Sequence, residues 1–259
     1  MSDTGDVTLS IDGAVASVVF ERPAARNAMT WAMYQRLGAI CEQLAAEPGV
    51  RVACFRGAGG VAFVAGTDIE QFKAFEDGAA GVAYEQRIDG CMARLEALPM
   101  PTVAVIEGWA VGGGLAIATA CDIRIATPSA KLGVPIARTL GNCLSIANLA
   151  RLVAAFGRPR VQRMLIGAEI LGADEARACG YLAQVVAADA IDAAASDLCA
   201  RLATLAPVTQ AVTKEGLRRL LLQHLPDAQD LILRSYGSED FREGVNAFSE
   251  KRSPVWRGR

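Results

Sequence analysis

Short apolar runs alternate with amphipathic stretches along the first half of this chain. Two apolar runs flank Asp12-Gly13, a pattern that predicts a β-hairpin. Strands that alternate with helices are typical of parallel α/β units with crossover connections. The predicted strands lie at residues 7–11, 14–20, 52–56, 102–106 and 123–126, and the predicted helices at residues 27–46 and 79–98, with a further helix start at 68–72.

Helical patterns dominate after about residue 144, and one short strand at residues 182–186 interrupts them. We therefore predict an α/β fold with an α/β core at residues 1–195 and a C-terminal helical region at residues 196–259. The predicted helices of the second half lie at residues 146–156, 160–166, 174–179, 191–205, 208–223, 228–236 and 240–250.

Composition excludes several classes of protein. Hydrophobic residues make up 52% of the 259 residues, which argues against a disordered chain. A formal net charge of −2 without a basic block argues against a nucleic-acid partner. No apolar run approaches the roughly 20 residues of a membrane span, and no signal peptide is visible at the N-terminus. We therefore expect neither a nucleic-acid nor a membrane partner.

Cysteine and histidine usage narrows the chemistry further. The seven cysteines are odd in number and widely spaced without a CxxC motif, which favours reduced thiols in a cytoplasmic protein over a zinc or other metal site. The single histidine, His224, lies at the end of a predicted helix, so a Ser-His-Asp or Cys-His nucleophile system is disfavoured.

Three consecutive glycines, Gly112, Gly113 and Gly114, open an apolar, alanine-rich segment that we interpret as a buried helix. Glycine at a helix start lets a ligand approach bare backbone N–H groups, where the helix dipole favours negative charge. Such donors can form an oxyanion hole, which points to thioester or other carbonyl chemistry.

Five segments together resemble the crotonase (enoyl-CoA hydratase/isomerase) superfamily. They occur in the family's order across nearly the whole chain, as RPAARNAM at 22–29, FVAGTDI at 63–69, the glycine segment at 108–123, AKLGVP at 130–135 and the C-terminal segment at 239–252. The resemblance implies a crotonase-like spiral of ββα units with a C-terminal helical trimerisation region. It also implies a homotrimer, or a hexamer built as a dimer of trimers.

The resemblance implies an acyl-CoA thioester substrate, with coenzyme A as part of the substrate and no separate cofactor. The backbone N–H groups of Thr67 and Gly113 would form the oxyanion hole. Asp68 has the alternative role of a helix N-cap, and Arg26 and Lys251 that of solvated charges. The positions implied to contact the coenzyme A moiety are Ala24, Ala25, Arg26, Ala65, Asp68, Ile69, Phe248 and Lys251.

The chain departs from the family at both catalytic glutamates. Hydratases of this family use two glutamates around one water, and the matching positions here are Ala116 and Ile136. Between Asp122 and Asp174 the only acidic residue is Glu169, in a separate predicted helix and turn. Because each acid–base group typically contributes ~10²–10⁴-fold, we expect ordinary hydration to be impaired. Replacement acids are sought in the 70–90 region, where most charges should be solvated: Glu70, Glu76, Asp77, Glu85 and Asp89.

Several other residues near the expected site have more than one possible role. Arg138 could bind a substrate carboxylate or be a surface arginine, with equal weight. The run LGVP at 132–135 is similar to the methylmalonyl-CoA decarboxylase branch, although Ile136 lacks that branch's polar residue. Cys143 is interpreted as a packed thiol, Asp122 as a structural partner, and Tyr84 and Tyr236 as acyl-pocket or packing residues.

The sequence therefore predicts two alternative functions. The first is an acyl-CoA enzyme that stabilises a thioester enolate and catalyses decarboxylation, isomerisation or C–C cleavage. The second is a non-catalytic acyl-CoA binder that keeps the same loops.

Overall fold

A computed structural model describes residues 5–259 of the chain. Strands β1 (Asp6–Asp12) and β2 (Val15–Glu21) pair antiparallel, with Asp12 opposite Val15 across the Gly13-Ala14 turn. The hairpin predicted from Asp12-Gly13 is confirmed.

A six-stranded sheet continues from this hairpin in the order β1-β2-β3-β5-β7-β10. Every strand pair after the hairpin is parallel, which confirms the predicted parallel α/β units. The added strands are β3 (Val52–Gly57), β5 (Thr102–Ile106), β7 (Ile123–Ala126) and β10 (Gln184–Val185).

A second, four-stranded sheet has the order β4-β6-β8-β9. None of its strands was predicted from the hydrophobic pattern, because three-residue strands next to glycines leave no readable period. The strands are β4 (Ala62–Val64), β6 (Trp109–Val111), β8 (Lys131–Gly133) and β9 (Ile170–Gly172).

The helices of the first half follow the predicted order, with a correction at one start. Helix α1 (Trp31–Ala45) begins four residues after the predicted residue 27, because the Thr30 side chain accepts a hydrogen bond from Met33 N. Asn27 is instead buried, and its amide donates to the carbonyls of Ala58 and Ala62. The other helices here are the 3₁₀ helices η1 (Pro23–Ala25) and η2 (Ile69–Ala74), then α2 (Gly78–Glu96) and α3 (Gly113–Ala120).

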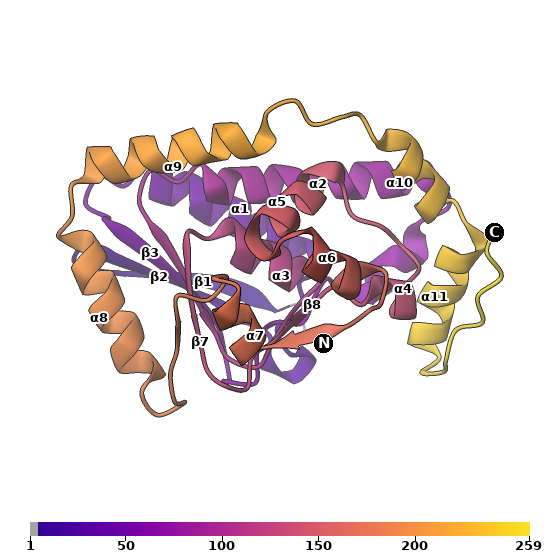
Figure 1. Ribbon diagram of the computed structural model, residues 1–259, viewed down its shortest axis with the longest axis horizontal. Coiled ribbons are helices and arrows are strands. Elements are labelled where there is room, and N and C mark those ends of the chain that lie inside the picture. Colours follow the sequence, from indigo (N-terminus) through magenta and orange to yellow (C-terminus); the bar gives the residue numbers. More distant parts are fainter. Residues whose placement is uncertain (1–4) are drawn as a thin grey trace.

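The second half is mainly helical, as predicted. Figure 1 shows α8 at one end of the molecule, α9 along its edge, and α10 and α11 at the opposite end beside the C-terminus. The predicted boundary at residue 195 falls inside α8 and stays a prediction. The helices are α4 (Ile136–Thr139), α5 (Ile146–Phe156), α6 (Arg158–Leu165), α7 (Ala173–Ala178), α8 (Ile191–Ala203), α9 (Pro207–Leu222), α10 (Gln229–Tyr236) and α11 (Glu239–Ser249).

Apolar side chains cover the six-stranded sheet on both faces. The larger core joins the sheet to α1, α2 and α3, and a smaller cluster packs Val103, Val105 and Ile125 against Ile191 and Leu198 of α8. Burial on both faces explains why all five residues of β5 are buried and why its sequence is a continuous apolar run. Within residues 5–259, no helix combines the length and apolar character needed to cross a membrane.

Candidate active site

A cavity of about 460 Å³ lies where the glycine segment meets the loop after β4. It is lined by parts of the segments 22–28, 65–72, 109–113 and 134–144. Tyr84 and Glu85 of α2 and Phe248 of α11 complete the wall. The cavity therefore joins elements that are distant in sequence.

The backbone amides of Thr67 and Gly113 lie side by side on this cavity. A Cβ atom placed on Gly113 would be 3.7 Å from Thr67 N. Within the described residues, neither N–H donates a hydrogen bond. Gly113 is the first residue of α3, so its N–H lies at the positive end of the helix dipole. Two unpaired donors, one of them at a helix start, can bind a developing negative charge.

Glycine is required at Gly113 and Gly114 by close approach. A Cβ on Gly113 would collide with the Tyr34 hydroxyl, and a Cβ on Gly114 would collide with the carbonyl oxygen of Val64 in β4. The Tyr34 hydroxyl lies 2.8 Å from Thr67 Oγ1. The glycine run therefore brings the start of α3 against β4 and against the Thr67 loop.

Most residues implied to contact coenzyme A line this cavity: Ala25, Arg26, Ala65, Asp68, Ile69 and Phe248. Ala24 and Lys251 are exposed and do not line it. Asp68 is the N-cap of η2, as its alternative interpretation proposed, and its carboxylate pairs with Arg22 at 2.7 Å. The Asp68 side chain is therefore engaged in holding the loop.

Neither position of the missing glutamates supplies an acid. Ile136 lines the cavity with an apolar side chain. Ala116 instead faces a separate void of about 10 Å³ beside Asn148 and Arg151. The carboxylates that line the cavity are those of Asp68 and Glu85.

Glu85 brings an acid into the cavity from α2. Its side chain is 2% exposed, and it forms no ion pair with the described residues. One carboxylate oxygen accepts a hydrogen bond from the Tyr236 hydroxyl at 2.6 Å, and the other accepts from Ser145 N at 2.8 Å. Burial raises the pKa of Glu85 from 4.5 to about 7, against the lowering effect of these two hydrogen bonds.

The other four acidic candidates of the 70–90 region do not line the cavity. Glu70 pairs with exposed Lys73, Glu76 is exposed, and Asp77 caps α2. Asp89 accepts from Ser145 Oγ and pairs with Arg151. A sequence signal for Glu85 existed, because it falls on the same helical stripe as the buried residues Gly81, Tyr84, Ile88, Met92 and Leu95. A carboxylate on the core-facing side of a helix is a functional-site candidate.

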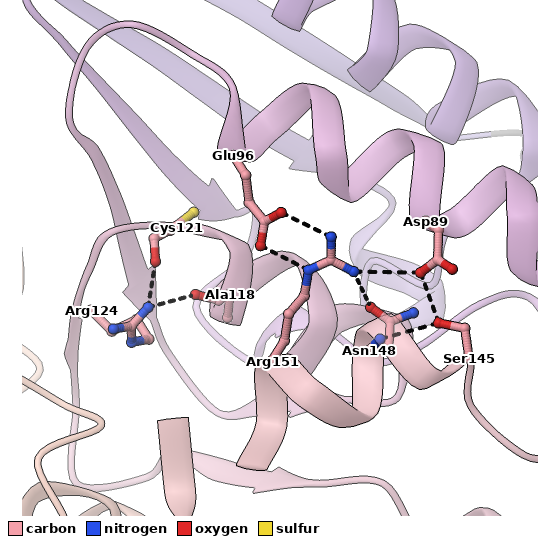
Figure 2. Close-up of polar contacts among 8 residues, drawn as sticks. All are labelled: Asp89, Glu96, Ala118, Cys121, Arg124, Ser145, Asn148 and Arg151. Carbon is pink, nitrogen blue, oxygen red and sulfur yellow. Dashed lines mark hydrogen bonds and ion pairs between the residues drawn. The ribbon is translucent and has the colours of Figure 1, made fainter. Parts of the chain in front are cut away.

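A buried charge network fixes the start of α5 against α2. Figure 2 shows the guanidinium of Arg151 between Glu96 and Asp89. Arg151 is 3% exposed and donates to both carboxylate oxygens of Glu96 at 2.7 and 2.8 Å. Ser145 Oγ bonds Asp89 at 2.8 Å while Ser145 N bonds Glu85. The network therefore holds the backbone donor that contacts Glu85.

Comparison with known proteins decides the family. Residues 10–259 match the sequence model of the Enoyl-CoA hydratase/isomerase family. The chain belongs to the enoyl-CoA hydratase/isomerase family. The resemblance to the crotonase superfamily, drawn from five short segments, is thereby confirmed.

Relatives and solved structures of this family agree over nearly the full length. The chain is 33% identical to (E)-benzylidenesuccinyl-CoA hydratase of Thauera aromatica, over 97% of this chain and 99% of the relative. An enoyl-CoA hydratase structure from Mycobacterium avium subsp. paratuberculosis K-10 is 29% identical, with a TM-score of 0.82 over 97% of this chain and 98% of that one. Methylmalonyl-CoA decarboxylase in complex with 2-nitronate-propionyl-CoA is 25% identical, with a TM-score of 0.89 over 98% of both chains. The crotonase-like fold class is confirmed by these neighbours.

Two further residues, Arg138 and Cys143, take the non-catalytic one of their alternative roles. Arg138 is on the exposed side of α4, while Ile136, Thr139 and Leu140 face the cavity, so the structure does not bring Arg138 to the site. Burial raises the pKa of the Cys143 thiol to about 11, which disfavours the nucleophilic thiolate.

Asp122 has the structural role that the sequence suggested. Its carboxylate accepts from the backbone N and hydroxyl of Thr102 and pairs with Lys214 at 2.7 Å. His224 is exposed just beyond the end of α9. Residues 5–259 hold no group of three or more His, Cys, Asp or Glu side chains placed to bind a metal ion.

We expect Glu85→Gln to stabilise this protein at pH 8. Because folding raises the pKa of Glu85 from 4.5 to about 7, its contribution to stability is present below pH 4.5 and is lost as pH rises to about 7. At about 1.4 kcal/mol per pH unit, loss of the buried charge should raise the free energy of unfolding of the variant by up to about 3 kcal/mol at pH 8. Part of this gain is offset, because the glutamine NH₂ group faces a donor, either the Tyr236 hydroxyl or Ser145 N. Urea unfolding at equal protein concentration, at pH 5 and pH 8, measures the difference.

Glu107→Gln is the control for this stability measurement. Glu107 is also a buried glutamate, but it pairs with Arg56 at 2.7 Å and does not line the cavity. Its replacement should not stabilise the protein at pH 8, because it removes an ion-pair partner. A Glu85→Gln variant less stable than the wild type at pH 8 would contradict the expectation.

Proposed function

We propose that this chain is an acyl-CoA-processing enzyme that holds a thioester oxygen between the N–H groups of Thr67 and Gly113 and stabilises an enolate. One observation carries the proposal: two neighbouring backbone donors, one of them at the start of α3, have no acceptor in the described residues and line a cavity. Preorganised donors of this kind lower the energy of the charge that develops during carbonyl chemistry.

The coenzyme A moiety would enter along the loops that carry Ala25, Arg26, Ala65 and Ile69, with Phe248 at the rim. The Arg26 guanidinium is exposed and forms no ion pair with the described residues, which suits a phosphate. Coenzyme A would be part of the substrate, and we propose no separate cofactor.

The reaction we favour proceeds through an enolate without the two-glutamate hydration machinery. Ala116 and Ile136 can neither orient water nor move its proton. Decarboxylation, isomerisation and C–C cleavage all pass through a thioester enolate. The likeness to methylmalonyl-CoA decarboxylase, with a TM-score of 0.89, supports this group of reactions.

We also propose assembly as a homotrimer, or as a hexamer of two trimers. Helix α9 has no buried residue, and it exposes Val208, Val212, Leu217 and Leu220, which lie on two sides of the helix. A gathering of exposed apolar side chains on one helix is typical of a surface that packs on another subunit. The seven free cysteines support a cytoplasmic location.

Exchange of substrate α-protons with solvent tests the enolate directly. We expect the enzyme to incorporate deuterium into 3-butenoyl-CoA in D₂O, because the α-protons of this thioester are activated by both the carbonyl and the vinyl group. Mass spectrometry measures the exchange, and calorimetry measures thioester binding. Reactions without enzyme and with free coenzyme A are the controls.

Two outcomes would contradict the proposal. Tight thioester binding with neither exchange nor turnover of malonyl-, methylmalonyl-, crotonyl- and 3-enoyl-CoA would favour the non-catalytic acyl-CoA binder. Efficient crotonyl-CoA hydration would contradict the view that Ala116 and Ile136 disable this reaction.

A further inference from the structure

We propose that Glu85 is the acid–base residue of this enzyme and moves the proton at the substrate α-carbon in place of the two missing glutamates. The inference rests on the proposed function, because it requires a thioester at the Thr67 and Gly113 amides. It extends that function by assigning the proton transfer to a helix, α2, that carries neither family glutamate position.

A comparison of the two acidic residues that line the cavity favours Glu85 as the acid–base residue. Two carboxylates line the cavity, Asp68 and Glu85. Asp68 is engaged by Arg22 at 2.7 Å and caps η2 through the backbone N of Glu70. Glu85 has no cationic partner, and each of its oxygens accepts a single hydrogen bond. A carboxylate oxygen can accept more than one bond, so Glu85 keeps the capacity to take a proton from a bound molecule.

The Thr67 loop contacts the helix that carries Glu85, and both line the same cavity. The Tyr84 hydroxyl lies 3.0 Å from Thr67 Oγ1, and Tyr84 and Glu85 are consecutive residues that both line the cavity. The cavity lined by Thr67 and Gly113 therefore extends to this part of α2, where the acyl group of a thioester bound at Thr67 N would lie. Because Glu85 is 2% exposed, the cavity is its route to a substrate.

The proposed step needs no further reactant. The α-carbon–hydrogen bond breaks, and the proton forms an O–H bond on the Glu85 carboxylate. The released electron pair forms the double bond between the α-carbon and the carbonyl carbon, and the carbonyl π pair moves to the thioester oxygen. The two N–H donors stabilise that oxyanion. Return of the proton from Glu85 to carbon completes the cycle.

Tyr236 acts as a positioning residue for Glu85. Its hydroxyl donates to the carboxylate at 2.6 Å and accepts from Asn142 Nδ2 at 3.0 Å, so the direction of the hydroxyl proton is set. Asn142 also lines the cavity, and its buried Oδ1 has no partner among the described residues. Such an acceptor can hold a polar group or water close to Glu85.

The surroundings of Glu85 leave it as the group that titrates near neutral pH. Burial raises the pKa of Tyr34, Tyr84 and Tyr236, so these phenols stay neutral. The Cys143 thiol is also neutral, with its pKa raised to about 11. The remaining facing charges are Asp89 and Arg151, which pair with each other. Exchange should therefore rise with pH through about 7, as the base form of Glu85 appears.

The test compares wild type, Glu85→Gln and the control Glu107→Gln in the exchange of 3-butenoyl-CoA in D₂O. We expect Glu85→Gln to lose at least about 10²-fold in exchange rate while thioester affinity by calorimetry stays within about threefold, since glutamine keeps the shape but not the basicity. Glu107→Gln should exchange like the wild type, because Glu107 lies outside the cavity.

The outcomes separate this inference from the function on which it rests. Exchange by Glu85→Gln at the wild-type rate would overturn the inference alone. Absence of exchange in a wild type that turns over malonyl- or methylmalonyl-CoA would also overturn the inference alone. Absence of both exchange and turnover would overturn the proposed function and the inference together.

The pH–rate profile of Tyr236→Phe distinguishes a positioning role of Tyr236 from a merely structural one. Loss of the donor to the carboxylate should shift the midpoint of the pH–rate profile upward and leave the rate at high pH close to wild type. An equal loss of rate at every pH would contradict the positioning role.

Discussion

Proline at Gly113 is expected to reduce α-proton exchange by about 10²–10³-fold relative to alanine at the same position, when both are made in a Tyr34→Phe background. Proline removes the N–H that would bind the thioester oxygen, yet the first position of a helix tolerates it because that N–H has no intrahelical partner. Tyr34→Phe removes the hydroxyl that a Cβ at Gly113 would meet. Deuterium incorporation into 3-butenoyl-CoA measures the ratio.

Gly113→Ala in the same background is the matched control. It adds the same Cβ atom and keeps the N–H, so the ratio of the two rates reports the replacement of that hydrogen-bond donor by the proline Cδ. Circular dichroism and thermal unfolding check that both variants fold. Equal exchange rates in the proline and alanine variants would show that Gly113 N–H does not contribute to the oxyanion hole.

Arg151→Met is expected to lower the free energy of unfolding by about 3–5 kcal/mol, the usual cost of leaving a buried charge without its partner. Arg151 is 3% exposed and binds Glu96 through two hydrogen bonds, while also contacting Asp89 and Asn148. Methionine would fill part of the space but leave the carboxylates of Glu96 and Asp89 uncompensated. Urea unfolding at pH 7 measures the loss.

Arg163→Met is the matched control for Arg151→Met. Arg163 also pairs with two carboxylates, those of Glu169 and Glu175, but it is close to half exposed. Water screens such pairs, so its replacement should leave the unfolding midpoint nearly unchanged. Adding Glu96→Gln to Arg151→Met should recover part of the lost stability. Similar effects of both arginine replacements would show that burial does not strengthen the Arg151 network.

Local patterns were sufficient for much of the fold. The Asp12-Gly13 turn predicted the hairpin, because its flanking runs have the right length and the turn needs a positive φ at Gly13. The continuous apolar run of β5 predicted a buried parallel strand. The four-stranded sheet was beyond such patterns, because its three-residue strands are held by neighbours far away in sequence.

Local sequence patterns likewise predicted only part of the candidate site. The glycines at 112–114 indicated exposed backbone donors, and Thr67 came from the family resemblance rather than from a pattern. Arg138 was weighed equally as a substrate contact and as a surface residue, and the structure places it on the exposed side of α4. A four-residue helix without a side-chain cap is too short to fix which way its side chains point, so the surrounding fold decides it.

The sequence by itself determined that the usual acids are absent, because Ala116 and Ile136 can carry no charge in any fold. It also determined that the start of α3 would present bare amides, since glycine adds no side chain there. Only the tertiary structure decided which acid enters the cavity. Gly81 lets the ring of Tyr236 pack against α2, and this contact joins Glu85 to a hydroxyl 151 residues away. Such a contact depends on how α10 docks on α2, which no local pattern records.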